Sequence, residues 1–280
     1  MGRPDGGGNS VDFLRGRRSH ELSNAERAAL DTVLSGRVEL AARQTIVRRG
    51  ELVEHSTLLL SGFMCRYMDA RDGFRQLVSV HVAGDFIDLH GYPLRRLDHD
   101  LATLADCVVA TVSHERLTDL VATYPNLGRL MWFATLLDAA MHREWIFRLG
   151  RLEAMGRVAH LLCETYTRLE AVDRAANYRF DFPLTQQDLG EACGLTSVHI
   201  NRTVRRLREA GLAEVTNREV RILDFPALAA EGEFKSDYLY LNTDFSSRGV
   251  KNDLTRGERP QSLVASPTAS RRAHPSTVQG

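Results

Sequence analysis

The sequence predicts an α+β fold made of an N-terminal β-roll, a long helix and a C-terminal winged helix-turn-helix. Short β-like runs separated by turn residues fill residues 38–112, which is typical of a roll or jelly-roll barrel rather than of βαβ units. Residues 126–149 then follow a helical pattern without interruption. Two short capped helices around a glycine occupy residues 184–212, and a strand-turn-strand pattern follows them.

Composition limits the class of protein. At 280 residues with 43% hydrophobic side chains, the chain has room for two modest domains, each with its own core. Its apolar runs fall short of the ~18–20 residues of a membrane span, and its start lacks the apolar segment of a secretory signal. We therefore expect a cytoplasmic protein with no membrane partner. The net charge is zero, so any affinity for nucleic acid must come from a local basic cluster.

The N-terminal part is predicted to be a flexible arm followed by the roll. Residues 1–18, rich in glycine and arginine, predict the arm, and residues 22–36 predict a short helix opened by Ser23 or Asn24. A later helical stretch is broken at Pro125. The predicted strands are residues 45–47, 57–60, 64–68, 76–80 and 108–112, with a hairpin turn at residues 69–73.

Residues 126–149 carry a narrow apolar seam with spacings of three and four. A seam of this length between two domains is typical of a two-stranded coiled coil, so we expect a homodimer through this helix. The alternative is a helix packed in the core of its own chain. Gly150 is expected to end the helix, and residues 152–169 to form the next one. The seam residues expected at the dimer interface are Leu130, Phe133, Leu137, Ala140 and Met141.

Residues 184–212 predict a helix-turn-helix that binds DNA. Thr185 precedes the first helix and Asp188 follows three residues later, close to a capping box. Gly194 stands where a tight turn between helices requires a residue without Cβ. Thr196 is placed to cap the second helix.

The second of these helices has one apolar face and one face that carries arginine. Ile200, Val204 and Leu207 recur at i, i+4 and i+7 and are expected to face a core. A helix of this kind is what reading of the DNA major groove requires. The alternative is an ordinary helical hairpin with solvated arginines, which the two caps, the glycine turn and the following hairpin disfavour. The polar face carries Ser197, Asn201, Arg202 and Arg205.

A strand-turn-strand completes the predicted winged helix. Residues 213–224 alternate between apolar and polar side chains around a turn at residues 216–218. Residues 178–182 alternate upstream, and Pro183 closes that run before the first helix.

The C-terminal end is predicted to be a tail. The pattern dissolves after the wing, and residues 227–280 are expected to be largely disordered because of their Ser, Thr, Arg and Pro content. Within them, residues 238–241 form an apolar patch that can dock on the body.

Three segments resemble the Crp/Fnr family of bacterial transcription regulators. They are residues 184–212, A-M-G-R-V-A-H-L-L at 154–162 and G-D-F-I-D-L-H-G at 84–91. The resemblance spans about residues 21–226 and implies a homodimer that binds double-stranded DNA at an inverted-repeat operator, with RNA polymerase as a further partner. The implied domains are a cyclic-nucleotide-binding-like sensor at 19–125, a dimerisation helix at 126–150 and a winged-helix DNA-binding domain at 151–226.

The resemblance also implies which side chains contact DNA. Arg202 falls where the family carries its recognition arginine and is expected to read a guanine. Val198 stands where the cyclic-AMP receptor and Fnr branches carry a glutamate, so the operator is expected to differ from theirs at that base; Val198 suits a thymine methyl and Asn201 an adenine. The expected contacts are Thr185, Gln187, Thr196, Ser197, Val198, His199, Asn201, Arg202, Arg205 and Arg218.

Residues 84–103, here called the sensor loop, depart from the cyclic-AMP receptor branch. That branch carries a glutamate for the ribose and an Arg-Ser pair for the phosphate, whereas Leu89 and His99-Asp100 stand in those places here. Because a carboxylate repels a phosphate and the charged donor is lost, we expect no binding of cyclic AMP. A diverged pocket that uses Arg95 and Arg96 in a shifted register is the alternative.

Other effectors are left open. Iron–sulfur sensing needs closely spaced N-terminal cysteines, and residues 1–64 contain none. Haem or metal sensing is an alternative if His81, His90 and His99 approach one another in the roll, although surface or structural histidines are favoured. No cofactor is predicted and the effector stays unidentified. The candidate pocket residues are Asp88, His90, Arg95 and His99.

No enzyme is expected. The chain lacks the phosphate-binding glycine motifs, the H-E-x-x-H zinc motif and the G-x-S-x-G nucleophile motif. No two cysteines form a C-x-x-C pair, so buried free thiols are expected rather than a metal site. Besides a DNA-binding regulator and an enzyme, a third class of function is a regulatory subunit that binds cyclic nucleotides and acts on a protein partner. Nothing in that class needs a winged helix. The cysteines are Cys65, Cys107, Cys163 and Cys193.

Overall fold

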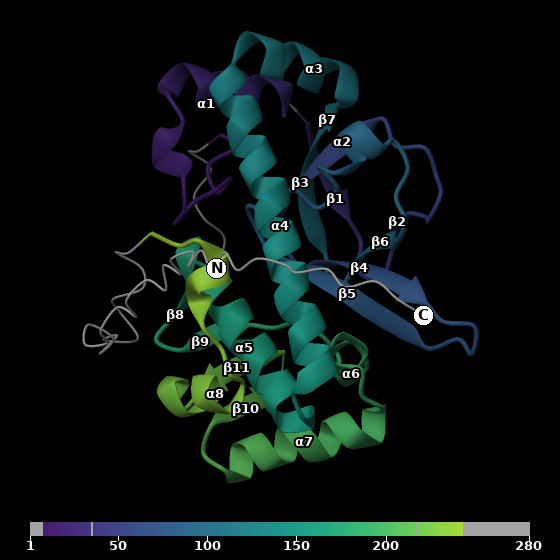
Figure 1. Cartoon of the computed structure of the whole chain (residues 1–280), viewed down its shortest axis with the longest axis vertical. Coiled ribbons are helices and arrows are strands. Elements are labelled where there is room, and N and C mark those ends of the chain that lie inside the picture. Colours follow the sequence, from purple (N-terminus) through teal and green to yellow (C-terminus); the bar gives the residue numbers. More distant parts are fainter. Residues whose placement is uncertain (1–7, 35, 217, 243–280) are drawn as a thin grey trace, which may run out of the picture. The chain divides into compact units, whose positions relative to one another are not determined.

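The computed structural model describes residues 8–34, 36–216 and 218–242, and it has the predicted α+β architecture (Figure 1). The strands of the N-terminal roll are β1 Gly36–Leu40, β2 Thr45–Val47, β3 His55–Ser61, β4 Met64–Asp69, β5 Arg75–His81, β6 Asp100–Thr103 and β7 Cys107–Ser113. They form two antiparallel sheets, with the orders β1-β7-β3 and β2-β6-β4-β5.

The core of the roll draws apolar side chains from both sheets. The predicted strands and the predicted hairpin between β4 and β5 are confirmed, with Asp69 paired to Arg75. Two strands were not predicted: β1 is largely exposed, and β6 is only four residues long, so neither shows a clear alternation. The buried core residues are Leu59, Met64, Ile87, Leu101, Cys107 and Val109.

Short helices flank the roll: η1 Ser19–Glu21, α1 Asn24–Val33, α2 Gly91–Leu94 and α3 His114–Thr123. The predicted cap of α1 is confirmed, because Ser23 accepts from the Glu26 backbone and the Glu26 carboxylate accepts from the Ser23 N–H at 2.8 Å. Leu30 of this helix is fully buried in a second apolar cluster that also contains Leu117 of α3.

The long helix α4 runs from Pro125 to Arg151, and α5 Ala154–Ala171 follows it. Pro125 opens α4, where its missing N–H has no partner to lose. The prediction that Gly150 ends the helix is wrong. Gly150 lies inside the last turn in open space, so it costs only its modest helix propensity, and the turn at Leu152 ends the helix instead.

The predicted dimer seam on α4 requires a correction. Leu130, Leu137, Ala140 and Met141 are buried within their own chain, against the roll, α3 and α5. Phe133 is half-buried and meets the ring of Tyr240 edge-on, with centroids 5.9 Å apart. The alternative of an intrachain core face therefore holds for these residues. The helix is apolar on a second side as well, and periodicity alone did not tell the two apart.

The C-terminal domain is the predicted winged helix. Its sheet has the order β10-β11-β9-β8, formed by β8 Ala175–Ala176, β9 Arg179–Asp181, β10 Ala213–Thr216 and β11 Glu219–Ile222. Helices α6 Gln186–Cys193 and α7 Ser197–Glu209 pack on α5. Gly194 between them has φ +63°, the left-handed conformation that the sequence predicts for a glycine turn.

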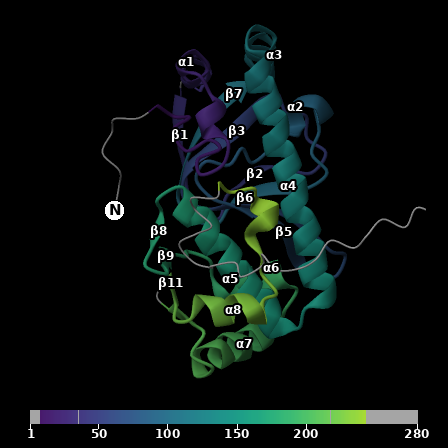
Figure 2. The same ribbon diagram turned by 60° about the vertical axis from the view of Figure 1, so that its left-hand side comes forward.

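Both terminal segments are more ordered than predicted. Phe13 and Leu14 are buried, so residues 8–18 are not a flexible arm. Residues 227–242 are not a disordered tail, because α8 Phe225–Glu231 packs on α5 and η2 Ser236–Leu239 contacts α4 and α5 (Figure 2). The predicted docking of residues 238–241 is confirmed at Leu239, which is fully buried. Residues 1–7 and 243–280 lie outside the described part of the chain.

Candidate nucleic-acid interface

Helix α7 presents one face to the core and the other to solvent. Thr196 caps it by accepting from the backbone N–H of His199, as predicted. Ile200, Thr203 and Leu207 are buried against the domain core. This packing fixes the rotation of α7 about its own axis, so the opposite face of the helix stays exposed to solvent.

All of the predicted DNA-contacting side chains are exposed. The most exposed large apolar side chain on α7 is that of Val198, at 70%. Arg218, in the wing turn, adopts φ +64° and is also exposed. The exposed set is Thr185, Gln187, Thr196, Ser197, Val198, His199, Asn201, Arg202, Arg205 and Arg218.

Some of these exposed side chains already have hydrogen-bond partners on α7, and others do not. Arg205 Nε donates to Glu209 Oε1 at 2.7 Å, and Asn201 Nδ2 donates to the Ser197 carbonyl at 2.9 Å. Arg202 has no ion-pair partner within the described ranges. Its guanidinium is thus the most available charged donor on the front half of the helix.

The sequence interpretation omitted two further arginines from its set of contacts. Arg206 and Arg208 are exposed in the last turn of α7, where positive charge also complements the helix dipole. Their signal was the same R-R-L-R run that contains Arg205. They widen the positive surface of the helix along its C-terminal half.

Helix α6 is anchored from outside its own domain. Asp188 forms an ion pair with Arg43 of the roll, and Gln76 Nε2 of β5 donates to the Glu191 carbonyl at 2.6 Å. Arg148 Nη2 of α4 donates to the Ala192 carbonyl at 2.9 Å. These donors satisfy carbonyls at the C-terminal end of the helix. The helix-turn-helix is therefore held against both the roll and α4.

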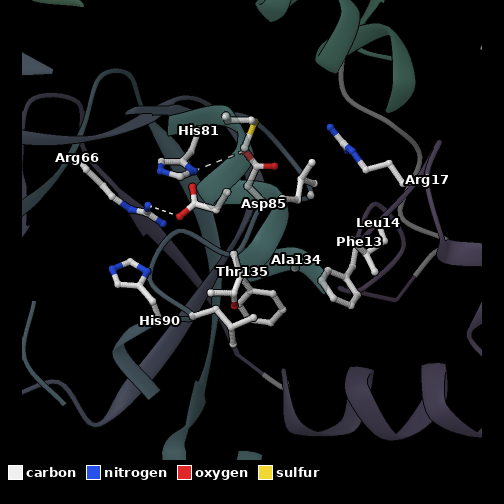
Figure 3. Close-up of a pocket in the computed structure, with 15 residues that line it drawn as sticks. Phe13, Leu14, Arg17, Arg66, His81, Asp85, His90, Ala134 and Thr135 are labelled. Carbon is white, nitrogen blue, oxygen red and sulfur yellow. Dashed lines mark hydrogen bonds and ion pairs between the residues drawn. The ribbon is translucent and has the colours of Figure 1, made fainter. Parts of the chain in front are cut away.

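A small cavity lies between the sensor loop and α4 (Figure 3). Its volume of about 30 Å³ is room for one or two water molecules. Of the predicted pocket residues, only His90 lines it. The others are elsewhere: the buried Asp88 carboxylate accepts from the Thr57 N–H at 2.5 Å, and Arg95 is exposed beside His114.

Histidines of the roll meet only in part. His90 Nε2 and His99 Nε2 are 3.0 Å apart, whereas His81 Nε2 pairs with Ser79 Oγ at 2.8 Å. Burial lowers the pKa of His90 to about 3 and also lowers that of His99, so both rings are neutral at pH 7. Among the described residues, no three His, Cys, Asp or Glu side chains gather as a metal site.

The polar wall of the cavity was not predicted. Arg66 Nη1 pairs with Asp138 Oδ2 of α4 at 2.6 Å, and Arg66 Nε donates to the Ile87 carbonyl at 2.8 Å. Burial opposes the charge of Asp138, but the facing Arg66, with smaller contributions from His81 and His142, lowers the Asp138 pKa to about 2. Burial lowers the pKa of His81 to about 4, and the Arg66 charge adds to this.

The cysteines lie in the roll (Cys65 and Cys107), in α5 (Cys163) and at the end of α6 (Cys193). All four are free and buried, which confirms the expectation of buried thiols. Burial raises the pKa of Cys163 and Cys193, so their thiols stay protonated at pH 7. Within residues 8–34, 36–216 and 218–242, no helix has the length and apolarity needed to traverse a bilayer.

Comparison with known protein families gives separate matches for the roll and for the winged-helix domain. Residues 37–124 match the model of the cyclic nucleotide-binding domain, and residues 156–231 match that of the Crp-like helix-turn-helix domain. Together the two matches cover more than half of the chain.

Relatives and solved structures agree. The transcriptional activator protein FnrL of Cereibacter sphaeroides is 29% identical over 203 residues, which cover 70% of this chain and 80% of that protein. FnrA of Stutzerimonas stutzeri is 24% identical, over 75% of this chain and 85% of that protein. The structure of FixK2 from Bradyrhizobium japonicum shares the fold, with a TM-score of 0.64, 22% identity and coverage of 70% and 96%. The chain therefore belongs to the Crp/Fnr family and is a transcription regulator with a helix-turn-helix DNA-binding domain.

Proposed function

We propose that this regulator binds an inverted-repeat operator as a homodimer, with α7 in the major groove of each half-site. The observation that carries the proposal is the exposed face of α7, where Arg202 has no ion-pair partner among the described residues. A major groove admits one helix, and an arginine on that helix is the commonest reader of guanine.

Arg202 is the proposed base-reading residue, and Arg205 has a lesser role. A bidentate contact from arginine to guanine is worth about 1–3 kcal/mol of discrimination. Arg205 must first leave Glu209, which accepts from its Nε at 2.7 Å, before it can bind a phosphate or a base. Val198 adds an apolar contact suited to a thymine methyl, because its side chain is 70% exposed near the start of the helix.

The proposed dimer uses the second apolar face of α4. Trp132 and Ile146 are 66% and 72% exposed, and Leu136 is exposed between them. Trp132, Leu136, Ala139, Arg143 and Ile146 follow spacings of four and three, the heptad spacing of a two-stranded seam. A second copy of the chain matches this face, because two-fold symmetry apposes the same stripe on each helix.

The proposal also includes RNA polymerase as a protein partner and the cytoplasm as the location. Relatives named transcriptional activators support the first of these. No small-molecule effector is part of the proposal, because the cavity beside the sensor loop has space for water rather than for a nucleotide.

Selection of bound duplexes from a random pool, followed by sequencing, tests the proposal. We expect an inverted repeat whose half-site centres lie about one helical turn, ~34–36 Å, apart. Arg202→Ala should weaken binding to that operator about 5- to 150-fold and leave non-specific affinity nearly unchanged. An equal loss on both kinds of DNA would reduce Arg202 to a phosphate contact. No enrichment of any sequence would refute operator binding.

A further inference from the structure

The first described residues of the chain form part of the wall of the small cavity between the sensor loop and α4, here called the sensor cavity. Phe13, Leu14 and Arg17 line it opposite the sensor loop and α4 (Figure 3). Phe13 is only 1% exposed, and its ring meets that of Phe86 edge-on with centroids 5.4 Å apart. This N-terminal segment, residues 8–18, therefore fills space between the loop and the helix.

The sensor loop is shaped to admit the segment. Gly84 has φ +92°, and a Cβ there would lie 2.4 Å from the carbonyl oxygen of Asp12. Only glycine permits this approach. Leu14 adopts φ +54°, a conformation that a leucine takes at a cost and that surrounding contacts must hold. Both features indicate a specific seat rather than an accidental contact.

The C-terminal segment, residues 232–242, holds the N-terminal one in place. Arg17 Nε donates to the Leu239 carbonyl at 2.9 Å, and the Asn242 N–H donates to the Gly16 carbonyl at 2.9 Å. Arg17 is buried, so this hydrogen bond and the nearby Asp85 carboxylate offset only part of its desolvation, and burial lowers the pKa of Arg17 to about 10. The two ends of the described chain are thus joined to each other by hydrogen bonds, and the N-terminal one lines the cavity.

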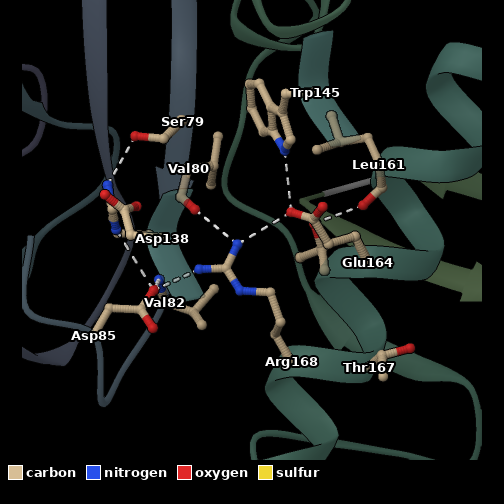
Figure 4. Close-up of polar contacts among 12 residues, drawn as sticks. Ser79, Val80, Val82, Asp85, Asp138, Trp145, Leu161, Glu164, Thr167 and Arg168 are labelled. Atoms are coloured by element: carbon tan, nitrogen blue, oxygen red, sulfur yellow. Dashed lines mark hydrogen bonds and ion pairs between the residues drawn. The ribbon is translucent and has the colours of Figure 1, made fainter. Parts of the chain in front are cut away.

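A chain of buried polar contacts joins this region to the helix that leads into the DNA-binding domain (Figure 4). Asp85 of the sensor loop accepts from Arg168 Nη2 of α5, and Arg168 Nη1 donates to the Val80 carbonyl at 2.9 Å. Glu164, one turn earlier, accepts from Arg168 at 3.3 Å and from the Tyr238 hydroxyl at 2.8 Å. Both terminal segments therefore help to fix the position of α5.

We propose that the N-terminal segment is a built-in occupant of the sensor cavity. In that position the segment holds α5 and the winged helix in the DNA-binding arrangement without a small-molecule effector. The remaining volume of about 30 Å³ is far below the ~300–1,000 Å³ of sites that take small molecules, and Phe13, Leu14 and Arg17 are among the side chains that bound it. The DNA-binding half of this proposal rests on the proposed function, whereas occupancy of the cavity does not.

Phe13→Ala in the full chain tests both halves, with Val11→Ala as the matched control. Val11 belongs to the same segment but is 40% exposed and does not line the cavity. We expect Phe13→Ala to speed amide hydrogen exchange about tenfold or more in residues 84–90 and 134–141, measured without DNA. Affinity for the selected operator should fall about tenfold as α5 is released. Val11→Ala should change neither.

Unchanged exchange in those two stretches would overturn the proposal, and so would faster exchange with full operator affinity. If Phe13→Ala does not fold, Phe13→Leu removes only the ring and should give the same changes at smaller size. A synthetic peptide of residues 8–18, added to a chain that lacks residues 1–18, should restore slow exchange, and the peptide with Ala at position 13 should not. If the wild-type chain enriches no operator, the proposed function fails and exchange alone decides occupancy.

Discussion

The winged helix and the sensor roll handle charge in opposite ways. On α7 the charged and polar side chains face solvent, and their partners, where they exist, lie four residues away. Arg66 of the roll is buried and pairs with Asp138 of α4 across 72 residues, and Asp85 of the roll pairs with Arg168 of α5 across 83. The difference separates a surface built to meet a partner from a buried network built to hold elements of one chain together.

The largest expected effect comes from placing the same charge on the buried face and on the exposed face of α4. Leu137→Glu places a carboxylate in the core of the chain and should prevent folding, because a buried unpaired charge has no compensating partner. Leu136→Glu places the same charge on the exposed face and should leave a folded monomer, measured by circular dichroism and sedimentation velocity. A dimer that survives Leu136→Glu would move the interface away from this face.

The next effect compares a buried ion pair with an exposed one. Arg66→Met leaves the partly buried Asp138 without its arginine and should cost up to about 3–5 kcal/mol of unfolding free energy, measured by urea denaturation. Arg179→Met breaks the half-exposed pair with Glu219, at 3.9 Å, and should cost at most about 1 kcal/mol. Equal costs would mean that the roll network contributes no more than a surface contact.

Acid should weaken the roll through His81. Its folded pKa is lowered to about 4 by burial, while the unfolded value is 6.5, so the unfolded state binds more protons between these values. Stability should therefore fall as the pH drops from about 6.5 to about 4, by up to about 3 kcal/mol. Asp88, with a pKa raised to about 6 by burial, opposes this below pH 6.

Replacement of His81 isolates its share. His81→Gln should flatten the fall in the urea midpoint between pH 6.5 and pH 4, since glutamine does not titrate. The exposed His199, which lies on α7 outside the roll, is the site of the matched control substitution, His199→Gln. A profile that His81→Gln does not alter would assign the acid sensitivity to other buried groups.

Local signals were the part of the molecule that the sequence predicted well. Ser23, Thr185 and Thr196 cap helices where the spacing of neighbouring residues indicated, and Gly194 makes the predicted turn. Each of these signals depends on residues within one helical turn. The exposed face of α7 follows from the same short-range periodicity, so the candidate DNA contacts emerged with it.

Long-range packing was the part that the sequence did not predict. Nothing local marks Arg66 and Asp138 as partners, because each looks like an ordinary surface residue until the fold joins them. Helix α4 is apolar on two sides, and its periodicity favoured the side that packs inside the chain. The glycine-rich N-terminus suggested an arm, yet Phe13 and Leu14 are buried in an apolar cluster with residues of the roll.

The mass of the complex between the full chain and its selected operator, without nucleotide, tests the central claim most directly. Native mass spectrometry or sedimentation should give two chains per duplex, and added cyclic AMP should change neither the mass nor the affinity. One chain per duplex, or a specific complex that forms only when cyclic AMP is added, would contradict a nucleotide-independent homodimer.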